Sequence, residues 1–139
     1  LAHTRLPVLL KGVMDEDDAL EAARLRVGGL IVSNHGGRTL DTLPATAEVL
    51  PAIVDAVGSS LPVLVDGGIR RGTDVLKAMA LGARAVLIGR PYIYGLANAG
   101  ALGVAHVIRL LRDELEIAMA LSGCAQLRDA SPELLGDPL

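Results

Sequence analysis

The chain has 139 residues and a formal net charge of −3; 51% of its residues are hydrophobic and 1% are aromatic. This length allows one domain with a sizeable core and excludes two domains of ordinary size. The weakly acidic balance argues against binding to nucleic acid or to an acidic membrane surface. Because the sequence has no Trp and no Phe, the core must be aliphatic, which suits parallel strands buried on both faces.

The single cysteine, Cys124, excludes an internal disulfide, and we expect it to be a packing residue. A lone cysteine fits a reducing compartment such as the cytoplasm and cannot supply a metal site by itself, so no metal is expected. No apolar run reaches the roughly 20 residues of a membrane-spanning helix. Because the sequence starts without an initiator methionine, we expect a fragment of a longer protein.

Strand and helix patterns alternate along the chain. The predicted strands are short apolar runs over residues 6–12, 30–33, 61–65 and 85–90. The predicted helices cover residues 15–27, 46–57, 73–81, 91–97 and 101–121. Pro51 lies inside the second helix, so we expect a kink or a late start there. The sequence thus predicts one domain, residues 1–125, and a tail, 126–139, with one turn or helix start near Ser131.

Four successive strand and helix pairs are typical of βα units on a parallel α/β sheet. An open four-stranded sheet this apolar would leave both edges unpaired, whereas eight such units close into a barrel. We therefore expect about four βα units that form the C-terminal half of a (β/α)8 TIM barrel. We expect the first strand to be buried. A doubly wound sheet is the alternative fold, but the first strand is followed by Lys11 and a single glycine, Gly12, so the glycine fingerprint of that fold is absent.

Polar residues and glycines follow each of the four predicted strands. In a barrel the carboxyl ends of the strands meet at one face, where the active sites of this architecture are built. We therefore expect these residues to surround one site. The candidate site residues are Lys11, Ser33, His35, Arg38, Asp66, Gly67, Gly68, Ile69, Arg70, Gly89 and Arg90.

The segment after the second strand combines Ser33, His35, two glycines and Arg38 before any helix can begin. Glycines let the backbone turn with positive φ and lie close to a ligand. Imidazole is the side chain best suited to move protons at neutral pH, and guanidinium is the side-chain group best suited to bind a carboxylate through two hydrogen bonds. The pattern predicts a base beside an anion-binding group. In the plainer alternative, His35 is a loop histidine held by structural hydrogen bonds.

The loops after the third and fourth strands predict a phosphate site. Gly67, Gly68 and Gly89 expose backbone N–H groups ahead of a helix, and Arg70 and Arg90 add positive charge. The last two strands of a barrel are also where this fold usually holds phosphate. In the alternative reading, the glycines only make tight turns and the arginines are solvated.

The remaining polar and aromatic residues have plainer expectations. Lys11 is either a site residue or a solvated lysine past a strand. Asp66 either caps the following turn or bonds a ligand hydroxyl. No catalytic role is expected for His3 or His106, and Tyr92 and Tyr94 are expected to pack the short helix.

In order and spacing, the strand-end motifs closely resemble the C-terminal half of the FMN-dependent α-hydroxy acid oxidase and dehydrogenase family, which includes glycolate oxidase, lactate oxidase and mandelate dehydrogenase. The resemblance covers residues 6 to about 124. The motifs that carry it are Lys11-Gly12, Ser33-Asn34-His35-Gly36-Gly37-Arg38, Asp66-Gly67-Gly68-Ile69-Arg70-Arg71-Gly72 and Gly89-Arg90-Pro91.

The resemblance implies a role for each site residue and FMN as the cofactor. Lys11 would lie by the N1/O2 edge of the flavin, and Ser33 would bond the isoalloxazine ring. Residues 66–70, with Gly89 and Arg90, would hold the ribityl chain and the phosphate. Arg38 would bind the carboxylate of a small 2-hydroxy acid, and His35 would be the base that starts its oxidation to the 2-oxo acid. Whether the electrons leave as a hydride or through a carbanion is left open.

The family's N-terminal half has no counterpart in this sequence. We therefore expect the activity to belong to a full-length parent enzyme, a homo-oligomer, with a tetramer favoured by the resemblance, and the fragment alone to be inactive. The substrate side chain and the electron acceptor, whether oxygen, a quinone or a cytochrome, are left open. Two other functions stay open: a different phosphate-binding barrel enzyme, and a non-catalytic half-barrel that binds a phosphorylated ligand.

Overall fold

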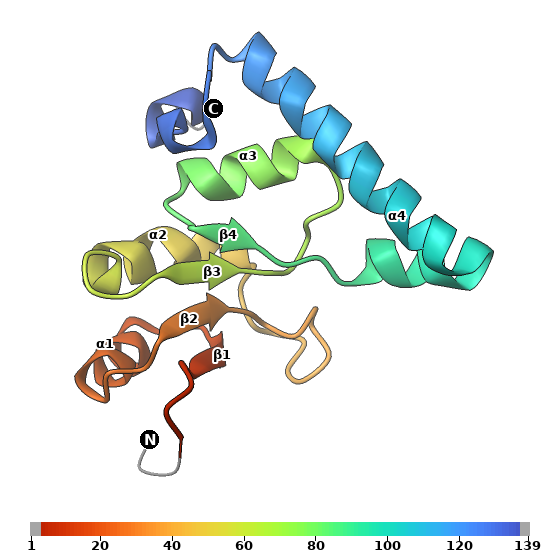
Figure 1. Cartoon of the computed structure of the whole chain (residues 1–139). Helices are drawn as coiled ribbons and strands as arrows, with labels where there is room; N and C mark the ends of the chain where they lie inside the picture. Colours follow the sequence, from red (N-terminus) through yellow and green to blue (C-terminus); the bar gives the residue numbers. More distant parts are fainter. Residues whose placement is uncertain (1–3, 137–139) are drawn as a thin grey trace.

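The computed structural model describes residues 4–136 of the chain, so His3 and the end of the predicted tail, 137–139, lie outside the described residues. Four short strands alternate with helices (Figure 1). The elements are β1 (Leu9–Val13), α1 (Glu16–Arg24), β2 (Gly29–Val32), α2 (Thr46–Val57), β3 (Val63–Val65), α3 (Gly72–Ala80), β4 (Ala85–Val86) and α4 (Arg90–Leu121). Two 3-10 helices, η1 (Leu127–Asp129) and η2 (Pro132–Leu135), follow them.

The four strands form one parallel sheet in the order β1-β2-β3-β4. Each strand therefore pairs with the next one along the chain, and the helix between them returns the chain to the same end of the sheet. This sequential order is that of a barrel, because a doubly wound sheet reverses its strand order near the middle. The strand order thus favours the predicted barrel over the doubly wound alternative.

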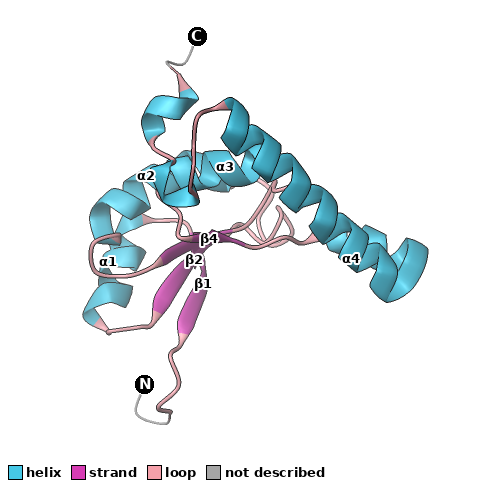
Figure 2. Cartoon of the chain, turned by 45° about the horizontal axis from the view of Figure 1, so that its top comes forward, coloured by secondary structure: helices cyan, strands magenta, loops and turns pink. Residues whose placement is uncertain are grey.

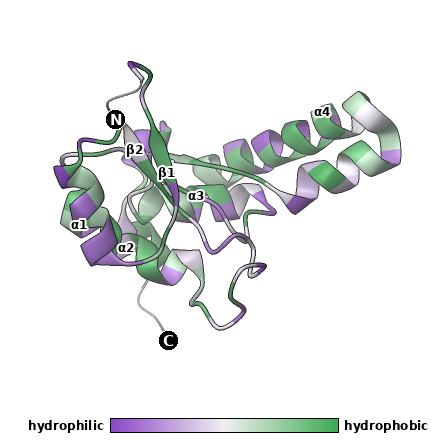
Figure 3. Cartoon of the chain, turned by 90° about the horizontal axis from the view of Figure 1, so that it is seen from below, coloured by the Kyte–Doolittle hydropathy of each residue, from purple (hydrophilic) through white to green (hydrophobic). Residues whose placement is uncertain are grey.

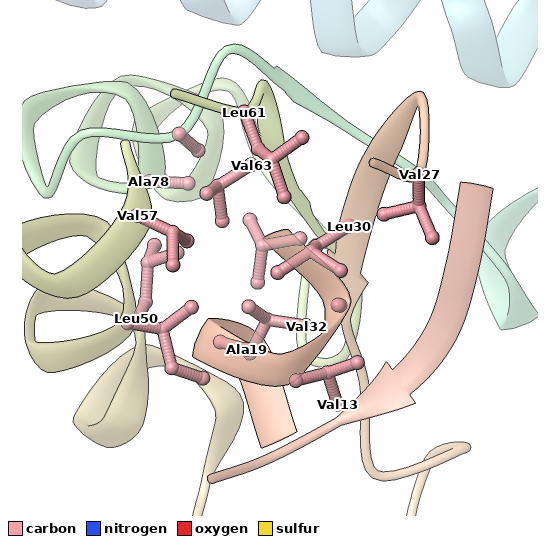
Figure 4. Close-up of a cluster of buried hydrophobic side chains, with 14 of the residues drawn as sticks. Val13, Ala19, Val27, Leu30, Val32, Leu50, Val57, Leu61, Val63 and Ala78 are labelled. Carbon is pink, nitrogen blue, oxygen red and sulfur yellow. The ribbon is translucent and has the colours of Figure 1, made fainter. Parts of the chain in front are cut away.

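One face of the sheet is covered by helices and forms the core (Figure 4). Leu30, Val32, Val63 and Val65 point to this face and are at most 2% exposed. Residues from α1, α2 and α3 pack against them, including Leu50, which is fully buried. The core is aliphatic, as the composition predicts, and Cys124 is buried as expected.

The other face of the sheet is apolar but uncovered. Ile31, Leu64 and Ala85 lie in register across three strands, and none of them is buried. Leu9 and Leu10 of β1 are 41% and 37% exposed, so the prediction that the first strand is buried is wrong for this chain. The physical reason is that β1 pairs with β2 alone among the described residues.

The first strand also ends differently from the prediction. It begins at Leu9 and continues to Val13, so that Lys11 lies inside the strand. The register with β2 shifts between Lys11 and Val13, and Gly12 has a φ of +102° at that irregularity. A bulge of this kind redirects a side chain next to a site. Elsewhere, α2 begins at Thr46 as predicted and continues through Pro51, so it has no late start.

The segment α4, Arg90–Leu121, consists of two helices joined at a kink, as the sequence predicts. Ala99 (φ −147°) and Gly100 (φ +57°, ψ −140°) have non-helical dihedral angles, and the chain turns back at this point (Figure 3). The two segments touch where Gly95 and Gly103 meet, because a Cβ on Gly103 would lie 1.8 Å from the Gly95 carbonyl oxygen. Tyr94 is 62% exposed, so the expectation that it packs the short helix is wrong.

By length and composition, α4 is long and apolar enough to cross a membrane, the one such helix in the part of the chain that is described. Any 18-residue stretch of α4 with at most two charged residues must end by Arg112, and therefore includes Ala99 and Gly100. No such stretch of α4 is a continuous helix. Both segments extend beyond the sheet (Figure 2), and the following 3-10 helices return to pack on α3.

Candidate active site

A cavity of about 820 Å³ opens at the carboxyl ends of the strands. It is lined by ten of the eleven residues that the sequence predicts for the site: Lys11, His35, Arg38, Asp66, Gly67, Gly68, Ile69, Arg70, Gly89 and Arg90. The eleventh, Ser33, is 1% exposed and is bonded to two of them. The structure therefore brings the predicted residues together around one space, while their individual roles stay predictions.

Lys11 is held between two partners from neighbouring strands. Its Nζ donates to Ser33 Oγ at 2.7 Å and lies 2.7 Å from Asp66 Oδ2. The Lys11 side chain is 36% exposed, so it keeps contact with the cavity. The lysine is thus not simply solvated: two contacts fix its positive charge at the cavity wall.

Asp66 has one engaged carboxylate oxygen and one orphaned oxygen. Oδ2 pairs with Lys11, whereas Oδ1 is buried and has no hydrogen-bond donor among residues 4–136. Thr46 Oγ1 donates to the Asp66 carbonyl oxygen at 2.6 Å and so anchors the backbone of this loop to α2. A buried carboxylate oxygen without a donor is unfavourable, so this geometry supports a bond to a ligand hydroxyl rather than a turn cap.

His35 sits in a tight turn with a left-handed backbone, φ +56°. Its N–H donates to Ser33 Oγ at 3.1 Å, and the Gly37 N–H closes the turn on the Asn34 carbonyl oxygen at 3.0 Å. The imidazole lies against Gly12, where an added Cβ would be 2.8 Å from Cε1. A non-glycine residue in this region of φ is uncommon and is often found at functional sites.

Arg38 follows His35 in the same loop and lines the same cavity. It is exposed, and within the described part of the chain no carboxylate pairs with it. Its guanidinium is therefore available to an anionic ligand close to the imidazole.

The loops after β3 and β4 each contain glycine and arginine and lead into a helix, but the two helices differ in how many N-terminal backbone N–H groups are free to bind an anion. Asp74 Oδ2 accepts from the N–H groups of Arg70 (3.0 Å) and Arg71 (2.9 Å), and Glu114 Oε2 accepts from Gly72 N–H at 2.9 Å. The first amides of α3 are therefore already paired with carboxylates. The predicted anion site cannot use that helix end without displacing them.

The N-terminus of α4 is the helix end that faces the cavity. It begins at Arg90, next to Gly89, and no side chain in the described range caps it. Added Cβ atoms on Gly68 and Gly89 would meet nothing within 4 Å, so both backbones border open space. A helix N-terminus with nearby guanidinium groups is a favourable place for a phosphate.

Three features of the site are missed by sequence reasoning. Gly12 forms the surface on which the imidazole rests, and only its position beside Lys11 signals this. Tyr92 lines the cavity, whereas the sequence predicts only that it packs the short helix. Arg90 Nη2 donates to the Gly36 carbonyl oxygen at 2.7 Å, a contact between residues 54 positions apart that no local pattern encodes.

The other histidine of the described range, His106, lies exposed on α4 and is not among the residues that line the cavity. No group of three or more His, Cys, Asp or Glu side chains able to hold a metal ion occurs between residues 4 and 136. The candidate chemistry is therefore concentrated in one imidazole, one carboxylate and several cationic groups.

Comparisons with known proteins match almost the whole length of this chain. The family model described as FMN-dependent dehydrogenase matches residues 1–137. A peroxisomal (S)-2-hydroxyacid oxidase of Arabidopsis thaliana is 60% identical over 126 residues, which are 91% of this chain and 35% of the relative. An L-lactate oxidase of a Roseobacter species is 55% identical over 135 residues, 97% of this chain and 36% of the relative.

Solved structures give the same result. A crystal structure of mandelate oxidase with benzoyl-formic acid superposes with a TM-score of 0.90 at 53% sequence identity, and the match covers 93% of this chain and 38% of that one. A second, with 3,3-difluoro-2-hydroxy-3-phenylpropionic acid, gives a TM-score of 0.91 at 52% identity. The chain thus spans little more than a third of the length of the proteins it matches.

Proposed function

The chain belongs to the family of FMN-dependent dehydrogenases, and on that premise we propose that the complete protein oxidises a small L-2-hydroxy acid to the 2-oxo acid with FMN as the electron acceptor. The fold is that of four βα units of a (β/α)8 barrel. The observation that carries the proposal is the single cavity that holds a base, an anion-binding group and a phosphate-type loop together. The names of the relatives, which are oxidases of 2-hydroxy acids, lactate and mandelate, support it.

The residues around the cavity fit FMN. The orphaned Asp66 Oδ1 suits a hydroxyl of the ribityl chain, and the open space at Gly68 and Gly89 leaves room for close approach of a ligand. Arg70, Arg90 and the N-terminus of α4 suit the phosphate. We assign the cofactor to Lys11, Ser33, Asp66, Gly67, Gly68, Ile69, Arg70, Gly89 and Arg90. When bound, FMN supplies the two-electron redox chemistry that no side chain offers.

Two residues are proposed to act on the substrate. The Arg38 guanidinium binds the carboxylate of the 2-hydroxy acid and so orients its α-carbon. Oxidation to the 2-oxo acid removes two electrons and two protons from the substrate. A nitrogen of the His35 imidazole takes one proton, and the two electrons and the other proton pass to bound FMN. The left-handed backbone of His35 and its contact with Gly12 hold the imidazole in place before the substrate arrives.

Lys11 is proposed to lie beside the flavin ring, where its positive charge favours electron uptake. Its contacts with Ser33 and Asp66 fix the ammonium group at 2.7 Å from each partner, so the charge is positioned in advance. Ser33 also accepts from the His35 N–H and therefore joins the flavin side of the site to the base.

We infer that further βα units complete the barrel in the working enzyme. The sheet of this chain has an uncovered face with Ile31, Leu64 and Ala85, and β1 and β4 are its edges. Closing the barrel would pair both edges and bury that face. Oligomerisation of complete barrels and a cytoplasmic location remain our proposals; the relative from Arabidopsis thaliana is named peroxisomal, so cell fractionation is the test of location.

The decisive experiment uses the complete protein. We expect a yellow preparation with a flavin absorption band that is bleached when glycolate, L-lactate or mandelate is added without oxygen, and the fastest of the three identifies the substrate class. A colourless protein that cannot be loaded with FMN would exclude this function and leave the other phosphate-binding barrel enzymes. Mass spectrometry of the native gene product that finds 139 residues would exclude the missing barrel units.

Two substitutions test the assigned roles. His35→Ala should remain yellow, because the histidine is not assigned to the cofactor, but should no longer be bleached by substrate. Arg38→Lys should raise KM most and also lower kcat, because lysine cannot form the two-pronged contact with a carboxylate. Near-normal kcat/KM in the His35 variant would rule out its assignment as the base.

A further inference from the structure

Arg90 reaches from the phosphate-type loop to the loop that carries the base. It is the first residue of α4, and its Nη2 donates to the Gly36 carbonyl oxygen at 2.7 Å. The two residues are 54 positions apart in the sequence and belong to loops that follow different strands. This hydrogen bond therefore connects the loop proposed to bind the phosphate with the loop that carries the proposed base, His35.

The accepting carbonyl lies at the tightest point of the base loop. Gly36 has a φ of +69° and lies between His35 (φ +56°) and Gly37 (φ +73°), so three successive residues are left-handed. The Gly36 N–H is bonded to Asn34 Oδ1 at 3.0 Å, which holds the His35–Gly36 peptide. The Gly37 N–H is bonded to the Asn34 carbonyl oxygen at 3.0 Å, which holds the peptide unit that carries the Gly36 carbonyl. The conformation between His35 and Arg38 thus depends on contacts that hold each peptide group in place.

The guanidinium of Arg90 also lies directly against Gly36. A Cβ at Gly36 would be 3.2 Å from Nη2, which is tighter than ordinary contact. Glycine therefore suits this position for two reasons, its left-handed φ and the close approach of Arg90. A side chain at this position would be strained by the left-handed φ and would push the Arg90 guanidinium away by a few tenths of an ångström.

The planar guanidinium has five N–H donors in a fixed arrangement, and one nitrogen is committed to Gly36. The same side chain lines the cavity together with Gly67, Gly68 and Arg70. Its other donors make no hydrogen bond within the described residues and are available to an anion. Because the guanidinium is rigid and planar, an anion bound to one edge of it fixes the orientation of the other edge. The position of the bound anion therefore affects the position of the Gly36 carbonyl.

We propose that Arg90 is a positioning residue: by bonding both a phosphate and the Gly36 carbonyl, it sets the geometry of the His35 to Arg38 loop when the phosphate site is filled. This inference rests on the proposed function, since FMN is the phosphate ligand in question. It goes beyond a role in holding the cofactor, because it predicts that substrate turnover depends on Arg90 even at saturating FMN.

The test compares Arg90→Lys with Arg70→Lys in the complete protein. Both changes keep the positive charge at the same cavity, but the side chain of Arg70 makes no hydrogen bond to another described residue, so it serves as the matched control. Both variants should bind FMN more weakly, as followed by quenching of flavin fluorescence. At saturating FMN, kcat/KM should be about tenfold lower in Arg90→Lys than in Arg70→Lys, because only Arg90→Lys also loses the charge-assisted hydrogen bond to the Gly36 carbonyl oxygen.

Hydrogen exchange gives a readout that does not depend on turnover. Adding FMN should slow amide exchange in residues 34–39 of the wild-type protein and of Arg70→Lys, but not of Arg90→Lys. Equal slowing in the two variants, with equal kcat/KM, would overturn the inference while leaving the function intact. A wild-type protein that binds no FMN would instead overturn the proposed function, and this inference with it.

Discussion

Replacing Gly12 by alanine is the most direct test of how the base is held. Gly12 has a φ of +102°, and an alanine Cβ there would be 2.8 Å from His35 Cε1, whereas ordinary contact begins at 3.4 Å. The imidazole or the β1 backbone must therefore move by at least 0.2 Å to reach the shortest contact that occurs, 3.0 Å, and by 0.6 Å to reach ordinary contact. Either movement displaces the base from the proposed substrate position.

The size of the effect follows from two contributions. The left-handed backbone should cost about 1–2 kcal/mol of stability for any residue with a Cβ. Misplacement of a catalytic group by about 1 Å costs about 100-fold in rate, so a shift of this size should lower kcat/KM by about 10- to 100-fold. FMN affinity should change little, because Gly12 is not among the residues assigned to the cofactor.

Gly123→Ala is the matched control. Gly123 is also left-handed, with a φ of +75°, but an added Cβ meets nothing within 4 Å, so the substitution has the same kind of backbone strain and displaces no other group. Both variants of the complete protein should lose similar thermal stability, while kcat/KM should fall in Gly12→Ala alone. Indistinguishable kcat/KM values for the two variants would refute the idea that Gly12 positions the imidazole.

Three further substitutions test packing and hydrogen bonding. Ser33→Ala removes a hydroxyl oxygen that accepts two hydrogen bonds, and should lower the free energy of unfolding, measured with urea, by about 1–3 kcal/mol. Ser60→Ala, at a turn, should change the free energy of unfolding far less. Equal losses in the two variants would contradict the central place of Ser33. Leu50→Ala, at a fully buried position, should cost about 2–5 kcal/mol, and a cost below about 1 kcal/mol would mean that the core is not packed as described. Glu114→Gln should lower the melting temperature, because it weakens the contact between this α4 carboxylate and the N-terminus of α3. Glu116→Gln, in an exposed ion pair of α4, should have almost no effect on the melting temperature. The reverse order would exclude the contact with α3.

Much of the fold follows from local patterns in the sequence. The alternation of apolar runs and amphipathic segments predicts the order of the elements, and the predicted bounds of α2 agree with the structure. The break within α4 is also predicted, because the pattern of residues 91–97 stops before that of residues 101–121 begins. These features depend on residues close together in the chain, which is why periodicity and helix-ending residues are sufficient to find them.

The gathering of the site residues could also be predicted. Lys11, His35, Asp66 and Arg90 lie within or just after successive strands, and parallel strands bring their carboxyl ends to the same edge of a sheet. Once the strands are parallel and in sequential order, the cavity follows. Knowing the strand ends is therefore enough to predict ten of the residues that line the cavity, although it misses Tyr92.

Only the tertiary structure decides how those residues contact one another. The contact of Arg90 with Gly36 and that of Glu114 with Gly72 join positions 54 and 42 residues apart, and both depend on side-chain directions that no local pattern encodes. The contact of the His35 imidazole with Gly12 likewise depends on a bulge in the pairing of β1 with β2. The sequence by itself determines which groups reach the rim of the sheet, because strand direction is a local property repeated along the chain. Packing between distant segments determines which donors are already paired and which remain for a ligand.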